Sequence, residues 1–232
     1  MTFIIAIQLN DSIVVAADNK EVVLKAEEIG NFNQRHTLKL NAWGNGIITG
    51  TGESYVISRS MELFKKLAHS DIDKLPQCLE ISRQIRELEI GAGYFQVEIS
   101  KLLCSSYSNR GAQLYKIERI DNDKSYTMTA IEPMDITVWM FNPNVETITA
   151  DLKNLYLDLK DYSAFSNKID WMNYYINRIA PIYQKQSLQD SLMSQSFDIF
   201  FQSKDDYVFG HIPNTQTTAL EFSEISTNFG SI

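Results

Sequence analysis

The sequence contains little cysteine and histidine, and their placement argues against a zinc site. Only two cysteines, Cys78 and Cys104, and three histidines occur among 232 residues. They form no CxxC pair and no cysteine–histidine spacing of the kind that binds zinc. Cys104 lies in an apolar stretch, so we expect it to be a small buried hydrophobic residue rather than a nucleophile. No metal or other cofactor is expected.

Basic clusters and phosphate-binding loops are also missing. The 21 Lys and Arg residues are outnumbered by 29 Asp and Glu residues, which gives a net charge of −8. This balance argues against non-specific binding to nucleic acid, and the sequence has no run of Lys or Arg that would indicate such binding. Neither GxGxxG nor GxxxxGK[ST] occurs, so nothing indicates a nucleotide site.

Long hydrophobic runs are absent as well. Gln8, Asn10 and Asp11 end the first apolar stretch too early for a signal peptide, and no basic segment precedes it. No stretch approaches the ~18 apolar residues of a membrane span, so no membrane partner is expected. The hydrophobic share of 44% suits one globular domain, which we expect over residues 1–213 in the cytoplasm, followed by a polar tail over 214–232.

Strands and helices are predicted in alternating blocks. The chain begins with two apolar strands, Phe3–Leu9 and Ile13–Ala17, joined by turn residues. In a helix over Leu75–Ile90 we expect Leu79, Ile81, Ile85 and Leu88 to face inward. Other strands are predicted near 35–40, 47–50, 99–107, 113–120, 126–131, 137–141, 197–202 and 207–212, with a turn at 41–46, a polar connection at 19–33 and helices at 54–67, 145–166 and after 168. This order favours an α+β layered sandwich over a parallel sheet.

The first hairpin carries the clearest chemical pattern. Folding it brings Asp18 back beside Thr2, so that a carboxylate lies near a hydroxyl close to the chain terminus. The small residue at position 2 permits removal of Met1, which would expose the α-amine of Thr2, and such amines titrate near ~7.7–8.0. A plain alternative exists, since many proteins begin Met-Thr with a hairpin and an Asp that closes a strand is often a turn residue.

With these residues in view, the chain resembles the proteasome β-subunit-like group of N-terminal nucleophile (Ntn) hydrolases, including its bacterial branch. Thr2–Ile7 followed by Ile13–Asn19 is similar to the family's opening threonine, hairpin and Ala-x-Asp-Ser/Asn signature. Leu38–Asn41 through Ile47–Gly52 resembles its next strand, turn and small-residue loop. Weaker likeness covers 102–115 and 197–209. The resemblance implies a four-layer α/β-β/α sandwich with two antiparallel sheets.

The resemblance also implies an activity and an assembly. The expected activity is hydrolysis of an amide bond in a peptide or protein, with Thr2 as nucleophile, Asp18 supporting a nearby cation and the Gly50 N–H donating to the oxyanion. Gly50 has a structural alternative, because a loop that tight needs a residue without a side chain. The expected assembly is a ring-like homo-oligomer stacked through the helices that flank Met61 and Leu88.

One departure from the family pattern concerns its catalytic lysine. Counting back from Gly50, that lysine falls at position 36, which is His36. Strand alternation places Lys39 on the face opposite His36, so we expect that Lys39 cannot replace the lysine. Histidine can act as a base near neutral pH, so His36 is a candidate partner for Asp18. A hydrogen-bonded structural histidine is the alternative.

Further departures lie nearer the C-terminus. The family's Gly-Ser-Gly is replaced by Phe141-Asn142-Pro143-Asn144, and its second acidic residue falls at Asp190, which could equally be a helix-end carboxylate. The serine expected next aligns with Met193, and Ser194 fits only with a shift. Two functions therefore remain open: a threonine-type peptidase, or a catalytically silent proteasome-like scaffold or binding protein.

Overall fold

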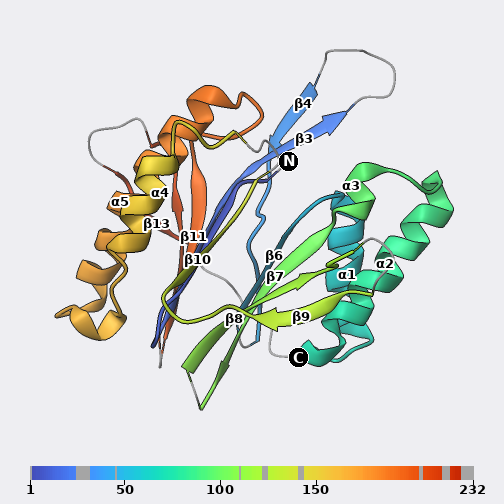
Figure 1. Cartoon of the computed structure of the whole chain (residues 1–232), viewed down its shortest axis with the longest axis horizontal. Helices are drawn as coiled ribbons and strands as arrows, with labels where there is room; N and C mark the ends of the chain where they lie inside the picture. Colours follow the sequence, from blue (N-terminus) through green and yellow to red (C-terminus); the bar gives the residue numbers. More distant parts are fainter. Residues whose placement is uncertain are drawn as a thin grey trace. The chain divides into compact units, whose positions relative to one another are not determined.

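The computed structural model describes residues 2–24, 32–44, 46–109, 111–121, 125–140, 144–203, 206–215 and 220–225. Its backbone divides into two compact units, the first formed by segments 1–40 and 132–228 and the second by 41–131. Each unit contains one larger antiparallel sheet and helices that pack on it (Figure 1). The antiparallel pairing predicted from the sequence is confirmed.

The sheet of the first unit has the strand order β10-β1-β2-β11-β12-β13. Every residue of β1 and β2 is buried. Burial on both faces accounts for their continuous apolar, β-branched sequence, which a half-exposed strand would interrupt with polar residues. The strands are β1 (Ile4–Gln8), β2 (Ile13–Asp18), β10 (Asp135–Trp139), β11 (Phe197–Gln202), β12 (Tyr207–Ile212) and β13 (Ser223–Glu224).

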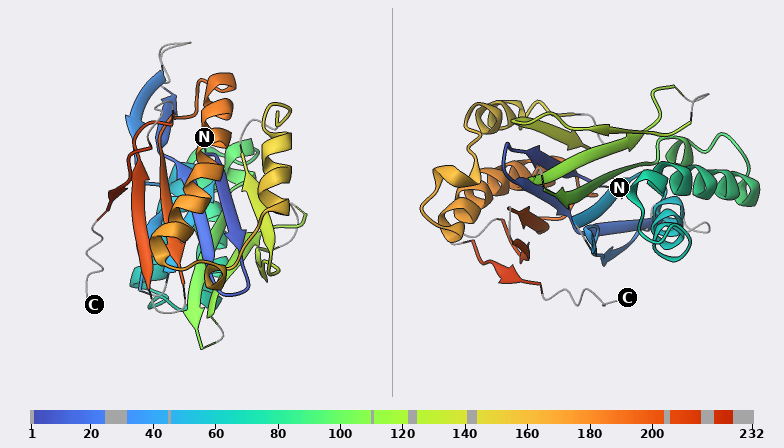
Figure 2. Two further views of the ribbon diagram at one scale, coloured as in Figure 1. Left: turned by 90° about the vertical axis from the view of Figure 1, so that its left-hand side faces the viewer. Right: turned by 90° about the horizontal axis from the view of Figure 1, so that it is seen from below.

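Helix α5 (Lys168–Gln189) is the main helical element packed on this sheet (Figures 1 and 2). The side chain of Asn167 accepts a hydrogen bond from the Asp170 N–H and so caps its first turn. Its aromatic stripe is core packing, since Tyr183 stacks on Phe197 at 4.5 Å between ring centroids. Two shorter elements precede it, α4 (Thr149–Leu157) and the 3₁₀ turn η2 (Tyr162–Ala164).

The second unit is built on the sheet β5-β6-β7-β8-β9. Helices α1 and α2 supply Phe64 and Leu79 to a core shared with Leu102 and Cys104 of the sheet. Cys104 is fully buried, as predicted, and burial raises the pKa of its thiol to about 12. The elements are β5 (Asn41–Trp43), β6 (Gly46–Thr51), α1 (Ser54–Lys66), η1 (Ile72–Lys74), α2 (Leu75–Ile90), α3 (Phe95–Glu98), β7 (Lys101–Ser108), β8 (Gly111–Glu118) and β9 (Thr127–Ala130).

The predicted inner face of α2 is largely wrong. Leu79 is buried, but Ile81, Ile85 and Leu88 are 39%, 37% and 88% exposed. The helix carries two apolar stripes at helical spacing, and the pattern alone does not say which one faces the sheet. The stripe that packs inward consists of Leu75, Cys78, Leu79 and Ser82.

The stretch after Asp18 also differs from expectation. Instead of a polar connection followed by a strand near 35–40, the chain forms a hairpin of β3 (Lys20–Leu24) and β4 (Phe32–His36). Residues 37–40 have no regular structure, and the expected turn at 41–46 begins with the short strand β5. The sequence did not reveal this hairpin, because polar residues flank the short apolar run Val22-Val23-Leu24.

Candidate active site

Asp18, the last residue of β2, is held beside Phe3, which follows Thr2 and directly precedes β1. The Phe3 N–H donates to its Oδ1 at 2.7 Å, and the Lys20 N–H lies 3.3 Å from its Oδ2. The Asp18 N–H in turn donates to the Phe3 carbonyl at 3.0 Å. Asp18 is only 1% exposed, so these donors compensate for the loss of hydration of its carboxylate.

Lys39 supplies the positive charge next to this carboxylate. Its Nζ donates to Asp18 Oδ1 at 2.8 Å, with the two side chains 10% and 1% exposed. The expectation that Lys39 faces away was wrong, because strand β4 ends at His36 and alternation does not extend to residue 39. The Thr37 N–H instead donates to the Asn19 carbonyl, which holds this irregular segment against the end of β2.

Thr2, Asp18 and Asp190 line one small pocket of the first unit. The space is about the size of a single water molecule. Asp190 ends α5, and its Oδ1 accepts a hydrogen bond from the Leu192 N–H at 2.9 Å, so it is a helix-end carboxylate as well as a pocket residue. Gln186 is 2% exposed, and its Oε1 has no partner among the described residues. The remaining lining residues are Phe3, Met140, Leu192 and Met193.

The serine that contacts the end of β2 is Ser194, whereas Met193 occupies the position at which the family pattern has a serine. Asn19 donates its backbone N–H to Ser194 Oγ at 3.1 Å, and Ser194 Oγ donates to the Ser196 carbonyl at 2.6 Å. Ser196 Oγ donates to Asn19 Oδ1 at 2.7 Å. These bonds fix the chain that follows α5 to the residue directly after Asp18.

The same network continues to a pair that sequence reasoning missed. Asp198 Oδ1 lies 2.7 Å from His211 Nδ1, whose ring also lies 3.3 Å from Asn19 Nδ2. Burial raises the pKa of the Asp198 carboxyl, although the hydrogen bond from His211 opposes this shift. The sequence signal that could have revealed this pair is Asp198, a single acidic residue in the otherwise apolar run Phe197–Phe201.

His36 occupies a different place from the one predicted. It is exposed at the end of β4 and lines an open cavity with Lys20. Within the described parts of the chain, no hydrogen bond or ion pair joins His36 to Asp18. Lys39 is therefore the cation beside Asp18, and a catalytic role for His36 stays a prediction.

Gly50 belongs to β6 in the second unit, where packing alone requires a residue without a side chain. A Cβ there would lie 2.7 Å from Leu102 Cδ2 and from the Lys101 carbonyl oxygen. It would also lie 2.9 Å from Ile57 Cδ1. The oxyanion role of Gly50 stays a prediction. Met1 and Phe141-Asn142-Pro143 lie outside the described residues.

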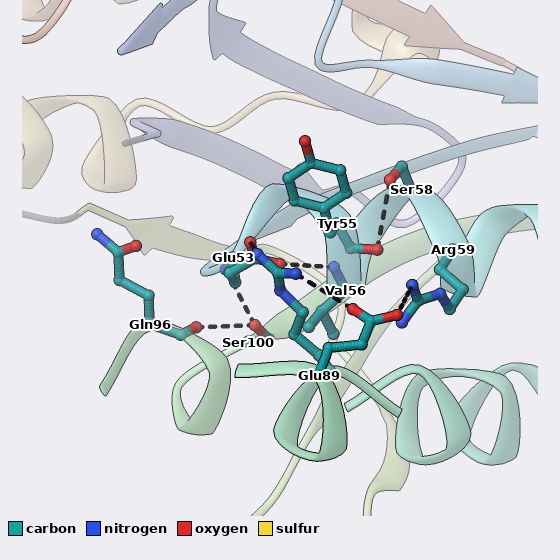
Figure 3. Close-up of polar contacts among 9 residues, drawn as sticks. Glu53, Tyr55, Val56, Ser58, Arg59, Glu89, Gln96 and Ser100 are labelled. Carbon is teal, nitrogen blue, oxygen red and sulfur yellow. Dashed lines mark hydrogen bonds and ion pairs between the residues drawn. The ribbon is translucent and has the colours of Figure 1, made fainter. Parts of the chain in front are cut away.

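The second unit carries a separate charged cluster between α1 and α2 (Figure 3). Glu53 caps α1 and pairs with Arg86 at 3.1 Å, and Arg86 pairs with Glu89 at 3.1 Å. Glu89 pairs with Arg59 at 2.6 Å, and the Arg86 guanidinium lies 4.6 Å from the centre of the Tyr55 ring. Each of these charges has an opposite partner, so the cluster joins the two helices.

The described residues contain no group of three or more His, Cys, Asp or Glu side chains that could hold a metal ion. None of the helices in these ranges is long and apolar enough to cross a membrane.

Two antiparallel sheets with helices packed on them are the architecture of the proteasome-like Ntn hydrolase fold. The structure matches the Gly-1 mutant of Anbu from Hyphomicrobium sp. strain MC1, a bacterial proteasome-related protein. The match has a TM-score of 0.60 and 9% sequence identity, and it covers 98% of this chain and 88% of that one. At this identity the likeness shows the fold. No family model and no curated protein matches the sequence.

Proposed function

We propose that the protein is a threonine-type hydrolase, most simply a peptidase, with Thr2 as its nucleophile once Met1 is removed. The observation that carries this proposal is the buried Asp18–Lys39 ion pair next to the backbone that follows Thr2. A buried pair is expensive to desolvate and is weak evidence for stability, so its placement beside a nucleophilic side chain favours a chemical role.

The chemistry follows from the groups at this position. Thr2 Oγ1 attacks the carbonyl carbon of an amide, and its proton passes to the α-amine of Thr2. That proton then moves to the leaving nitrogen as the C–N bond breaks, which leaves an ester on Thr2 Oγ1. Water hydrolyses this ester and restores the hydroxyl. Lys39, held by Asp18, contributes positive charge that stabilises the attacking oxygen.

The test combines intact mass with an electrophile that reacts with both the hydroxyl and the amine of an N-terminal threonine. We expect the purified protein to lack Met1 and to gain the mass of one electrophile. Thr2→Ala should remove both the labelling and peptide hydrolysis, while its thermal unfolding stays close to that of the parent. Complete retention of Met1 together with absence of labelling would refute the proposal.

The competing function is a silent proteasome-like scaffold or binding protein. Three sequence features favour it: the absence of lysine at position 36, the replacement of the family's Gly-Ser-Gly by Phe141-Asn142-Pro143-Asn144, and Met193 at the expected serine position. Because Lys39 pairs with Asp18, the first of these observations loses its force, whereas the other two remain. A folded protein that keeps Met1 and is not labelled would favour the scaffold.

We also propose that the chain assembles as a homo-oligomer through α2. Ile81, Ile85 and Leu88 share one face of that helix and are exposed in the single chain. Exposed apolar residues grouped on one helix face are typical of protein interfaces. We expect sedimentation at micromolar concentration to show an oligomer.

Leu88→Glu should shift this oligomer toward the monomer. Ile120→Glu is the matched control, because Ile120 is 78% exposed in the same unit but lies outside α2. A monomer in the parent protein, or equal dissociation by both variants, would contradict assembly through this face.

A further inference from the structure

A cavity of about 580 Å³ lies beside the Thr2 pocket, within the first unit. Met193 lines both spaces, so they are neighbours. Lys20 makes a second link, because its backbone N–H contacts the Asp18 carboxylate while the same residue lines the cavity. The described lining residues are Lys20, His36, Ser187, Ser191, Met193, Ser194, Gln195, Ser196 and Pro213.

This cavity has a charge opposite to that of the whole chain. The chain has a net charge of −8, yet no Asp or Glu is among the described residues that line the cavity. Lys20 and His36 are directly paired across the β3–β4 hairpin, so the two residues that line the cavity are neighbours. Lys20 Nζ donates one hydrogen bond, to the Ser191 carbonyl, and an ammonium has three N–H donors.

Hydrogen-bond donors surround these two basic side chains. The Ser191 hydroxyl and the Gln195 amide have no partner among the described residues, so each can donate to a ligand. Ser194 and Ser196 are already bonded to Asn19, and these bonds hold the wall in place. A wall of donors whose described residues include no acidic group suits a ligand that only accepts hydrogen bonds.

We propose that this cavity is a substrate subsite that binds a carboxylate group of the peptide on which Thr2 acts. The carboxylate belongs either to an Asp or Glu side chain or to the C-terminus of the peptide. An ionised carboxylate is an acceptor with two oxygens, which matches the Lys20 ammonium together with the His36 ring and the neutral donors. That the ligand is a peptide substrate rests on the proposed function. The positive charge of the cavity does not depend on it, because it comes from Lys20.

Binding to the inactive Thr2→Ala protein tests the subsite without turnover. The probes are alanine-based hexapeptides with a neutral dye, blocked at both ends, with Glu, Gln or Lys at one position moved along the peptide. A further peptide without charged side chains carries a free C-terminal carboxylate, which separates the two carboxylate sources. We expect at least one carboxylate peptide to bind roughly fivefold more tightly than its neutral counterpart, the gain of one partly exposed ion pair.

Substitutions in the same protein localise that gain. Lys20→Gln should remove the preference, and Lys20→Arg should keep it. Lys153→Gln is the matched control, since Lys153 lies on α4, is exposed and does not line the cavity. Equal binding of all peptides, no binding of any peptide, or the same loss with Lys153→Gln would overturn the subsite. If Thr2 is not labelled by the electrophile but the carboxylate preference depends on Lys20, the peptidase proposal fails and the subsite stands.

Discussion

The Asp18–Lys39 pair of the first unit and the charged cluster between α1 and α2 of the second unit differ in burial and in connectivity. Asp18 and Lys39 form a pair whose side chains are 1% and 10% exposed. The cluster between α1 and α2 is a chain of alternating charges whose side chains are partly exposed, from 12% for Glu53 to 38% for Glu89. Partly exposed charges keep some of their hydration and gain less from pairing, whereas a buried pair gives up hydration that its geometry must replace.

This difference indicates what each arrangement does. In the cluster between α1 and α2, Glu53 caps α1 and the ion pairs link α1 to α2, which is a structural task. The buried pair adds charge at a place where hydrophobic residues would pack at lower cost. Its position next to Thr2 supports the proposed role in catalysis.

The largest effect is expected from breaking the buried pair. Asp18→Ala or Lys39→Met leaves one charge buried without its partner, so each should lower the free energy of unfolding by about 3–5 kcal/mol. The double variant Asp18→Ala/Lys39→Met should lose much less than the sum of the single changes, because neither charge remains. Urea denaturation of the four proteins measures this coupling, and additive losses would show that the two side chains act independently.

A smaller effect is expected in the charged cluster between α1 and α2. Glu53→Ala removes both the cap of α1 and the partner of Arg86, and we expect a loss of about 1 kcal/mol. In 1 M salt, where the Debye length is about 3 Å, the ion-pair part of this loss should shrink. The loss caused by Lys39→Met should stay nearly unchanged, because buried pairs are screened less. Equal salt dependence of the two variants would contradict the comparison.

The smallest effect concerns pH. Hydrogen bonds from Arg59 and Arg86 hold the pKa of Glu89 below its ordinary value of 4.5. A carboxyl whose pKa is lower in the folded state contributes stability above its unfolded pKa, and loses it as pH falls through the folded pKa. The parent and Glu89→Gln should therefore differ in unfolding free energy near neutral pH and converge in acid below 4.5. A difference that grows in acid would assign the effect to another group.

Much of the fold was predictable from the sequence, because it depends on patterns with a clear period. The opening hairpin, the last hairpin and the bounds of α2 follow from apolar strands, turn residues and helical spacing. The inner face of α2 was not predictable, since Leu79 and Leu88 lie on two equally apolar stripes and tertiary packing chose between them.

The candidate site was predictable only where strands position it. The pairing of β1 with β2, which the sequence predicts as a hairpin, brings Asp18 to Phe3 and into the pocket that Thr2 also lines. Lys39 reaches Asp18 from a segment without regular structure, where side chains do not alternate between two faces as they do along a strand. The Asp198–His211 pair depends on the register of β11 with β12, which composition does not reveal.

The central claim is that Lys39 and Asp18 serve the chemistry of Thr2, and the rate of electrophile labelling tests it most directly. We compare the parent with Lys39→Gln, and use Lys185→Gln as a control because Lys185 pairs with Asp151, is 49% exposed and is not among the described residues that line the Thr2 pocket. The account predicts that the parent and Lys185→Gln lose Met1 and are labelled on Thr2 at similar rates, and that Lys39→Gln is labelled on the order of 10²-fold more slowly while still folded. Labelling of folded Lys39→Gln at the parental rate would contradict it.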